Sequence, residues 1–347
     1  MIDYNAVQLR KLSIHQVGNR SKEDGVRLSV EPVILDNQET MNYLRQYFLS
    51  AFNTVVEVFQ FSHPSMLDLN EVFTFCGKIF NDEEQFHEQS MAIARHLYER
   101  SSHPKINNGE LSVSLFENIN FRGVEVKAIG IFKAESRDVF LQFNRRYDKF
   151  DVNHQDGIPV NKLEKGCLIL ELEQETGYQV LIIDSNRSGD AHYWKNEFLQ
   201  VRPCADSYQF TRNLLTLTKD FVTQQVPDEF QATRTDQIDL LNRSVEYFKT
   251  HETFNKQEFE QEVFHHDHMI ESFRRFDNSI TRDDNFQIED NFQISTQAVK
   301  KQARVFKSVL KLDKNFHIYI HGNRDLIEHG VDERGRKFYK IYYDNES

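Results

Sequence analysis

A run of short apolar segments joined by turn residues, between residues 109 and 185, constrains the fold most strongly. Segments such as VEVKAIGIFKAE (124–135), KGCLILELEQ (165–174) and GYQVLIID (177–184) have the length and apolar content typical of strands. Glycine-containing turns separate them, including Arg122-Gly123 and Thr176-Gly177. Because short turns join neighbouring strands, we predict an antiparallel, meandering sheet rather than a doubly wound parallel one.

Helical spacing of apolar residues appears on both sides of this strand run. Before it, Met41, Leu44, Phe48 and Phe52 lie on one side of a predicted helix, and two more helices are predicted within residues 68–102. After Pro203, we predict helices over 207–226, 235–251, 255–264 and about 296–308, followed by strands over 315–322, 326–331 and 337–344.

These patterns predict an α+β fold with two domains. Residues 1–206 would form N-terminal helices with a mainly antiparallel sheet, and residues 207–347 a helix-rich unit that ends in a small β-sheet. No apolar run approaches the roughly 20 residues of a membrane helix. The three cysteines are far apart and odd in number, which favours a reducing compartment. We therefore expect a soluble cytoplasmic protein, with no membrane partner.

The charge is distributed unevenly along the chain. The whole sequence has a formal charge of −12, and residues 220–293 alone contain 17 acidic and 7 basic residues. The segment KKQARVFKSVLKLDK (300–314), in contrast, has six Lys or Arg residues and one Asp. Two interpretations of this segment stay open: a solvated helix face, or a contact to nucleic acid that is modest and salt-sensitive because the rest of the protein is acidic.

The only tryptophan lies in SGDAHYWKNEFLQVRP (188–203), between a predicted strand and a predicted helix. One interpretation is that Tyr193 and Trp194 pack at the junction between sheet and helices. The other is that basic side chains form a phosphate-facing rim with aromatic stacking nearby. That rim would consist of Arg187, His192, Lys195 and Arg202.

Motifs for catalysis or cofactor binding are weak. Glu125 and Lys127 lie two residues apart on a predicted strand, as in metal-dependent nucleases, but the same spacing is common on exposed strand faces. The histidines in HHDH (265–268) are too closely spaced to converge on one zinc ion. The sequence has no phosphate-binding glycine motif and no GxSxG motif. We therefore predict no catalytic residues, no cofactor and no metal site.

Three stretches in combination carry a resemblance to a known family. They are FRGVEVKAIGIFKAESRDVFLQF (121–143), FDVNHQDGIPVNKLEKGCLILEL (150–172), and AHYWKNEFLQVRP (191–203) followed by YQFTRNLLTLTKDFV (208–222). In order and spacing the chain resembles the 37-kDa nucleoid-associated protein family of bacteria. The resemblance implies a cytoplasmic protein at the bacterial chromosome that binds DNA without an enzymatic step. It also implies contact with chromosome-handling proteins such as a type II topoisomerase.

We therefore expect a non-enzymatic DNA-binding protein that contacts the phosphate backbone with little sequence selectivity. The expected contact residues are Lys300, Lys301, Arg304, Lys307 and Lys311, with Arg187, Lys195 and Arg202 as a second group. Two alternatives stay open. The acidic region 220–293 would dock onto a basic protein partner at the nucleoid, or Glu125 and Lys127 would belong to a metal-dependent nuclease.

Overall fold

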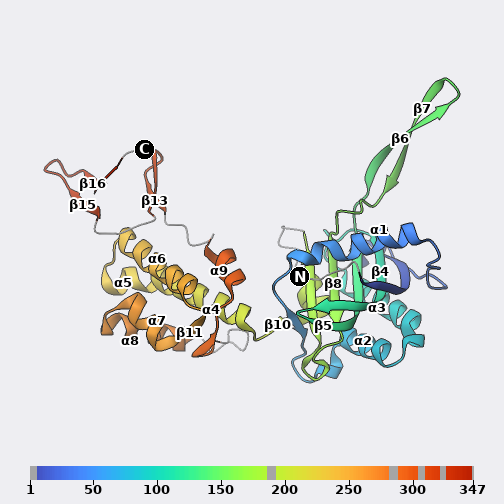
Figure 1. The fold of residues 1–347 in the computed structure, drawn as a ribbon, viewed down its shortest axis with the longest axis horizontal. Helices are drawn as coiled ribbons and strands as arrows, with labels where there is room; N and C mark the ends of the chain where they lie inside the picture. The colour runs from blue at the N-terminus through green and yellow to red at the C-terminus, as the bar shows by residue number, and fades with distance from the viewer. Residues whose placement is uncertain (1–5, 186–192, 281–287, 304–308, 321–325, 346–347) are drawn as a thin grey trace. The chain divides into compact units, whose positions relative to one another are not determined.

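The computed structural model describes residues 6–185, 193–280, 288–303, 309–320 and 326–345 (Figure 1). The chain divides into two compact units, Met1–Cys204 and Ala205–Ser347, and each is described by itself. The sequence places the boundary between residues 206 and 207. The structure has the predicted α+β class, with a large antiparallel sheet in the first unit and small sheets near the C-terminus.

The first unit contains an eight-stranded sheet in the order β10-β3-β9-β8-β5-β4-β1-β2. Each pair of neighbouring strands is antiparallel. In chain order the strands are β1 (Gln8–Val17), β2 (Val26–Arg27), β3 (Phe59–Phe61), β4 (Gly109–Phe121), β5 (Val124–Ala134), β8 (Lys165–Leu170), β9 (Gln179–Asp184) and β10 (Val201–Pro203).

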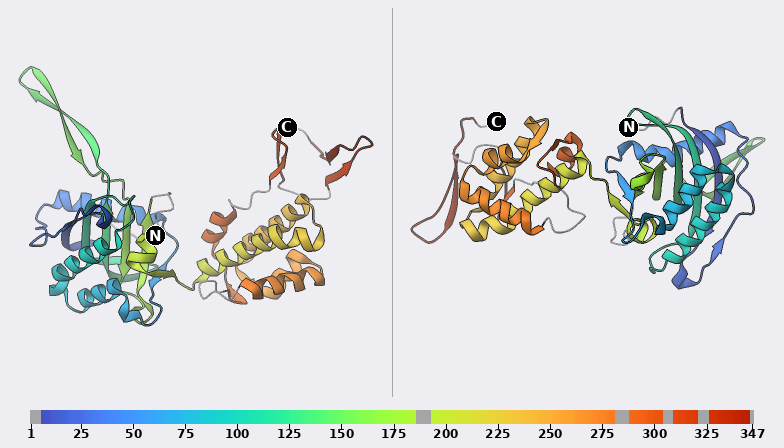
Figure 2. Two further views of the ribbon diagram at one scale, coloured as in Figure 1. Left: turned by 180° about the vertical axis from the view of Figure 1, so that it is seen from behind. Right: turned by 90° about the horizontal axis from the view of Figure 1, so that it is seen from below.

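Helices cover both faces of this sheet (Figure 2). Helices α2 (Glu71–Asn81) and α3 (Phe86–Arg100) share one apolar cluster with Cys167 and Ile169 of β8, whereas α1 (Gln38–Leu49) shares another with Leu168 and Leu170. Successive residues of a strand point to opposite faces, so a strand covered on both sides must be apolar throughout. This explains why the segment 165–172 has a continuous apolar run rather than an alternating pattern.

The turn between β8 and β9 depends on Gly177. Its φ is +113°, in the left-handed region, and a Cβ atom there would lie 2.4 Å from the carbonyl oxygen of Phe61. The backbone of β3 therefore approaches this turn closely, and the Phe61 N–H donates to the Gly177 carbonyl at 2.8 Å. The hairpin predicted from the Thr176-Gly177 signal is confirmed.

Strands β6 (Asp138–Arg146) and β7 (Lys149–Gly157) form a two-stranded sheet of their own, which we call the arm. It extends away from the large sheet (Figure 1). Nine residue pairs follow one another without a register shift, from Asp138 opposite Gly157 to Arg146 opposite Lys149. At about 3.3 Å per residue, the arm is about 30 Å long. The sequence predicts the first strand of this hairpin but not the second.

The second unit is built from helices around a phenylalanine-rich core. They are α4 (Ser207–Asp220), α5 (Val226–Phe230), α6 (Arg234–Thr250), α7 (Lys256–Phe264), α8 (Asp267–Ile280) and α9 (Thr296–Ala303). Phe221, Phe264 and Phe273 contact one another in this core, with ring centroids 4.8–5.5 Å apart. A short pair, β11 (Thr253–Asn255) and β12 (Asn291–Gln293), connects α6 and α7 to the segment before α9. The helices predicted over 207–226, 235–251 and 255–264 are confirmed, the first with a π-helical turn at Phe221–Gln225.

The C-terminal segment forms two hairpins rather than one small sheet. Strand β13 (Val309–Leu312) pairs with β14 (Phe316–Tyr319), and β15 (Ile327–Val331) pairs with β16 (Lys337–Ile341). Leu310 and Ile320 pack against Ile238 of α6. Strand β13 was not predicted, and the predicted helix over 296–308 is described only up to Ala303. Within the described ranges, no helix is long and apolar enough to cross a membrane.

Candidate nucleic-acid interface

The C-terminal lysines lie on two elements of the second unit. Helix α9 buries Ala298 and Val299 and exposes Lys300 and Lys301 in its last turn, where a positive charge is favoured by the helix dipole. Lys311 is exposed on β13, opposite His317. Arg304 and Lys307, which the sequence places in the same group, lie outside the described residues.

Like Lys314 and Lys337 of the same unit, these three lysines have no ion-paired carboxylate within the described ranges. No Asp or Glu among the described residues lies within ion-pair distance of Lys300, Lys301 or Lys311, although Lys301 Nζ lies 5.9 Å from the centre of the Tyr208 ring. Other cations of the same unit are neutralised, such as Lys256 by Asp277 at 2.8 Å. Among the described residues, no carboxylate thus neutralises the charge of Lys300, Lys301 or Lys311.

The second unit also has a polar cleft of about 510 Å³, and its cations, in contrast, are paired with carboxylates. Its two cations are Lys256, which pairs with Asp277 and Asp290, and Arg274, which binds Glu260 through two nitrogen atoms. Because carboxylates already neutralise both cations, this cleft offers a phosphate group little net attraction.

The second predicted group lies in the first unit. Lys195 is half-buried in a π-helical segment, η7 (Tyr193–Leu199), with its Nζ 4.4 Å from the centre of the Phe59 ring. Arg202 is exposed on β10, an edge strand of the large sheet. With the Gln60 amide in the orientation that its neighbours favour, Arg202 donates two hydrogen bonds of 2.9 Å to its oxygen. Arg187 and His192 lie outside the described residues.

The aromatic residues of this segment pack into the first unit. Trp194 is completely buried and contacts Phe198, with ring centroids 4.9 Å apart. Tyr193 is 4% exposed. Neither ring can stack on a nucleic-acid base in this arrangement, so the rim interpretation loses its aromatic component. The packing interpretation of residues 193 and 194 is the one that the structure supports.

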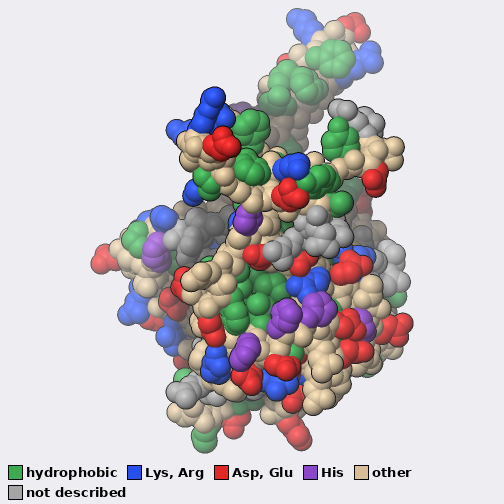
Figure 3. Space-filling model, turned by 90° about the vertical axis from the view of Figure 1, so that its left-hand side faces the viewer, with side chains coloured by type: hydrophobic (Ala, Val, Ile, Leu, Met, Phe, Trp, Pro, Cys, Tyr) green, Lys and Arg blue, Asp and Glu red, His purple; other side chains and the backbone are tan. Residues whose placement is uncertain are grey.

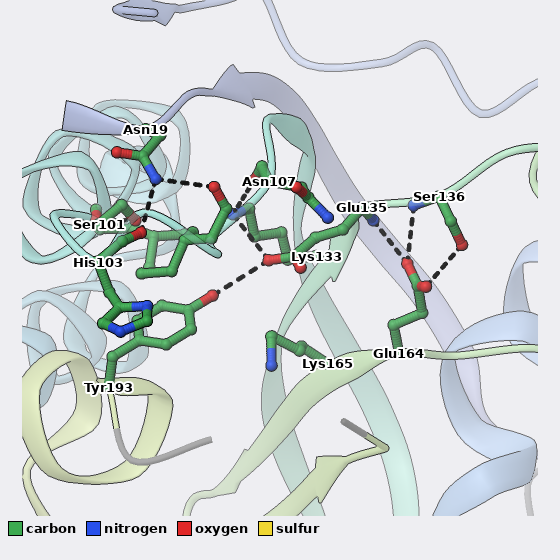
Figure 4. Close-up of polar contacts among 12 residues, drawn as sticks. Asn19, Ser101, His103, Asn107, Lys133, Glu135, Ser136, Glu164, Lys165 and Tyr193 are labelled. Atoms are coloured by element: carbon green, nitrogen blue, oxygen red, sulfur yellow. Dashed lines mark hydrogen bonds and ion pairs between the residues drawn. The ribbon is translucent and has the colours of Figure 1, made fainter. Parts of the chain in front are cut away.

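A buried polar cluster holds η7 in place (Figure 4). Lys133 and Lys165, opposite each other on β5 and β8, are both buried, and each binds a carboxylate: Glu135 at 2.9 Å and Asp184 at 3.0 Å. Tyr193 donates to Glu135 at 3.2 Å. Burial lowers the pKa of Lys133, and burial together with the Glu135 charge raises the pKa of Tyr193. These charges are matched internally, so the cluster connects η7 to the sheet.

Comparison with known families gives the biological context. The model of the NA37 family, described as nucleoid-associated protein YejK, matches residues 13–347. The chain belongs to this family of nucleoid-associated proteins. The match covers both units, which confirms the resemblance found in the sequence. No curated protein matches the chain.

In this nucleoid-associated protein, charged side chains that precede or include the nuclease candidates Glu125 and Lys127 form ion pairs. Lys127 Nζ binds Glu83 Oε1 at 2.5 Å, and this hydrogen bond raises the Lys127 pKa. Glu110 is bound by Arg137, and Glu117 by Arg10 at 3.3 Å. Glu125 is exposed near the start of β5. Lys127, Glu110 and Glu117 are thus engaged in ion pairs, whereas Glu125 has no ion pair within the described ranges.

One group of side chains in the described part of the nucleoid-associated protein has suitable spacing for a metal ion. His251, Glu258 and Glu262 each offer a ligand atom, all within 4.8 Å of one another. The His251 ring stacks on Tyr247, and its Nε2 lies 3.6 Å from Glu262 Oε1. None of the histidines in the 265–268 run belongs to this group. No contiguous motif marks this group in the sequence, because His251 directly follows α6 and the two glutamates lie on α7.

The arm is a second feature that the sequence predicts only in part, since its second strand, β7, was not predicted. Its end carries Arg145 and Lys149, both exposed, beside Tyr147, which is 96% exposed. The sequence does contain a signal for the hairpin: apolar residues at 139, 141 and 143 are mirrored by 150 and 152 about the turn at 147–148. Because acidic and polar residues stand between these apolar positions, the second strand was not predicted.

Proposed function

We propose that this nucleoid-associated protein binds DNA directly, through contacts to the phosphate backbone, without sequence selectivity and without catalysing a reaction. The carrying observation is that Lys300, Lys301 and Lys311 are exposed with no ion-paired carboxylate among the described residues, in a protein of a nucleoid-associated family. Lysine is a point charge on a flexible stem, and it binds phosphate without reading bases. The proposal places the protein in the cytoplasm, at the nucleoid.

Support for modest affinity comes from the charge balance. The formal charge of −12 repels a polyanion at long range, so a few unneutralised lysines hold DNA only while salt is low. Sequence-independent binding by phosphate contacts weakens linearly on a logarithmic salt scale, by about 0.9 per neutralised phosphate. The salt dependence of binding is therefore the most direct readout of how many lysines take part.

A mobility-shift titration at several salt concentrations tests the proposal. We expect K300A/K301A/K311A to bind more weakly and to have a salt slope smaller by about 3 in magnitude. The control K249A/R336A/K340A removes the same number of charges from ion-paired positions of the same unit, and it should keep the wild-type slope. Absence of any retardation by the wild-type protein at low salt would refute direct binding.

A second candidate is recruitment to the nucleoid by a basic surface of a protein partner such as a type II topoisomerase. It is favoured by exposed acids on the second unit that have no ion pair within the described ranges, namely Glu252, Asp267 and Glu271. Replacing these three by their amides should abolish recovery of a purified topoisomerase in a pull-down and leave DNA retention unchanged. Unchanged recovery of the topoisomerase would count against this candidate.

A further inference from the structure

The two faces of the arm have different character. Side chains that lie opposite each other in an antiparallel pair share a face, and the face alternates along each strand. One face carries mainly polar side chains, and Gln142 donates to Gln155 there at 2.9 Å. The other, which we call the apolar face, has five apolar side chains: Val139, Leu141, Phe143, Phe150 and Val152.

The apolar face is open to solvent. Its five apolar side chains are between 57% and 70% exposed, and Figure 3 shows hydrophobic side chains along the arm with Lys and Arg side chains near its end. An isolated two-stranded hairpin is only marginally stable in water, and a contiguous apolar strip on a soluble protein marks an interaction surface. The arm therefore gains stability when something apolar covers this face.

The positions of the charged residues on the apolar face indicate which kind of partner covers it. Arg145 lies at the outer end of the face and Asp156 at the inner end, with the five apolar residues and His154 between them. Among the described residues neither has an ion-pair partner. When two such faces pack with their strands running in opposite directions, the end with Arg145 meets the end with Asp156 of the other copy. The face is thus complementary to itself, as a twofold contact requires.

DNA fits this face less well. Residues 138–157 contain four acidic and three basic residues, so the arm as a whole does not attract a polyanion. A phosphate backbone also leaves an apolar strip uncovered. We propose that the arm is a self-association element, which packs its apolar face onto the same face of a second copy of this chain.

The size of the contact sets its strength. A ribbon about 30 Å long and about 10 Å wide offers roughly 300 Å² per copy, which is small beside the ~800 Å² per partner of a stable complex. The association is therefore reversible and depends on protein concentration. It joins two copies of each basic group, so DNA binding should strengthen as the dimer forms.

Sedimentation velocity of the full chain, from about 1 to about 100 µM, where weak complexes of this kind form, tests the proposal. We expect the mass to rise from that of the 41.2-kDa monomer to twice that value with concentration. The variant L141E/F143E should remain monomeric throughout. The control Q142E/N144E adds the same charge at neighbouring positions on the polar face of β6 and should dimerise as the wild type does.

A charge exchange separates a specific contact from damage to the hairpin. R145D and D156R should each weaken dimerisation at least tenfold, and R145D/D156R in one chain should restore it, because each copy then again offers both charges. The proposal is overturned if the wild type stays monomeric over the whole range, if L141E/F143E dimerises normally, or if the double exchange fails to restore association. It is equally overturned if L141E/F143E changes DNA retention while the dimer persists.

Discussion

Tyr193 donates a hydrogen bond to Glu135 across 3.2 Å, and this bond attaches the π-helical segment to strand β5. The same carboxylate oxygen lies 2.9 Å from Lys133 Nζ. Both Lys133 and the side chain of Glu135 are almost inaccessible to water. One buried carboxylate thus compensates a buried cation and positions the segment that contains Trp194.

Replacing Glu135 should strongly destabilise the first unit. E135Q leaves the Lys133 ammonium buried without its counter-charge, a change that costs about 3–5 kcal/mol in the free energy of unfolding. Denaturant unfolding measures this loss. The double variant K133M/E135Q removes both charges and should recover much of the stability. As a control, R20A breaks the exposed pair with Glu99 and should change stability by less than about 1 kcal/mol.

Stability should fall as the pH drops from about 6.5 to about 4, in part because of His15. Burial, with the nearby His87 and Arg95, lowers the His15 pKa to about 4. Its Nδ1 accepts from the Ser29 N–H at 3.2 Å, and its Nε2 lies 3.0 Å from Ser90 Oγ, so the fold requires the neutral ring. In this pH interval the unfolded chain binds a proton that the folded chain does not, which costs roughly 3 kcal/mol at full effect.

Denaturant unfolding at pH 7 and at pH 4.5 checks this assignment. H15Q retains a hydrogen-bonding side chain without a titratable ring, so it should lose less stability than the wild type over the same interval. An equal loss in both proteins would mean that other groups determine the acid sensitivity.

Gly177 and Gly123 provide a matched pair of substitutions. Both have positive φ, +113° and +88°, but only at Gly177 would an added Cβ atom meet backbone, 2.4 Å from the Phe61 oxygen. G123A should cost about 1 kcal/mol, the usual cost of a left-handed non-glycine residue. G177A adds a steric clash and should cost at least twice as much. Thermal unfolding of both variants decides whether the close approach of β3 matters.

Trp194 should report on folding but not on DNA. Because the indole ring is completely buried, its fluorescence should be weakly quenched by acrylamide and should shift to longer wavelength only on unfolding. Saturating DNA at low salt should leave the emission unchanged. Strong quenching by DNA would instead mean that a base contacts Trp194, and it would favour the stacking interpretation of residues 188–203.

The sequence predicts local features of the fold well, because turn residues and apolar period act over short distances. The β8–β9 hairpin and helix α1 follow from such signals. The environment of a charged residue is different. Lys127 and Lys133 occupy equivalent positions of one alternating segment, yet the Lys127 side chain is 39% exposed and Lys133 is fully buried. The two lysines differ in where they lie within the folded sheet, and this location cannot be read from the local sequence pattern.

The candidate site shows the same limit. The sequence identifies Lys300, Lys301 and Lys311 as cations, but whether a cation is free depends on carboxylates distant in the chain, as the pairing of Lys256 with Asp277 illustrates. Strand β7 was missed for another reason. Neither face of this strand is buried, so its side chains do not need to be apolar, and its sequence does not resemble that of a core strand.

The unbroken pairing of β6 with β7 limits how this hairpin can vary in length during evolution. If one residue is inserted into or deleted from a strand, every side chain beyond that point moves to the other face of the hairpin. Phe143 or Phe150 would then lie on the opposite face. Changes of two residues per strand preserve the pattern. Homologous chains should therefore carry longer or shorter hairpins that differ in even steps.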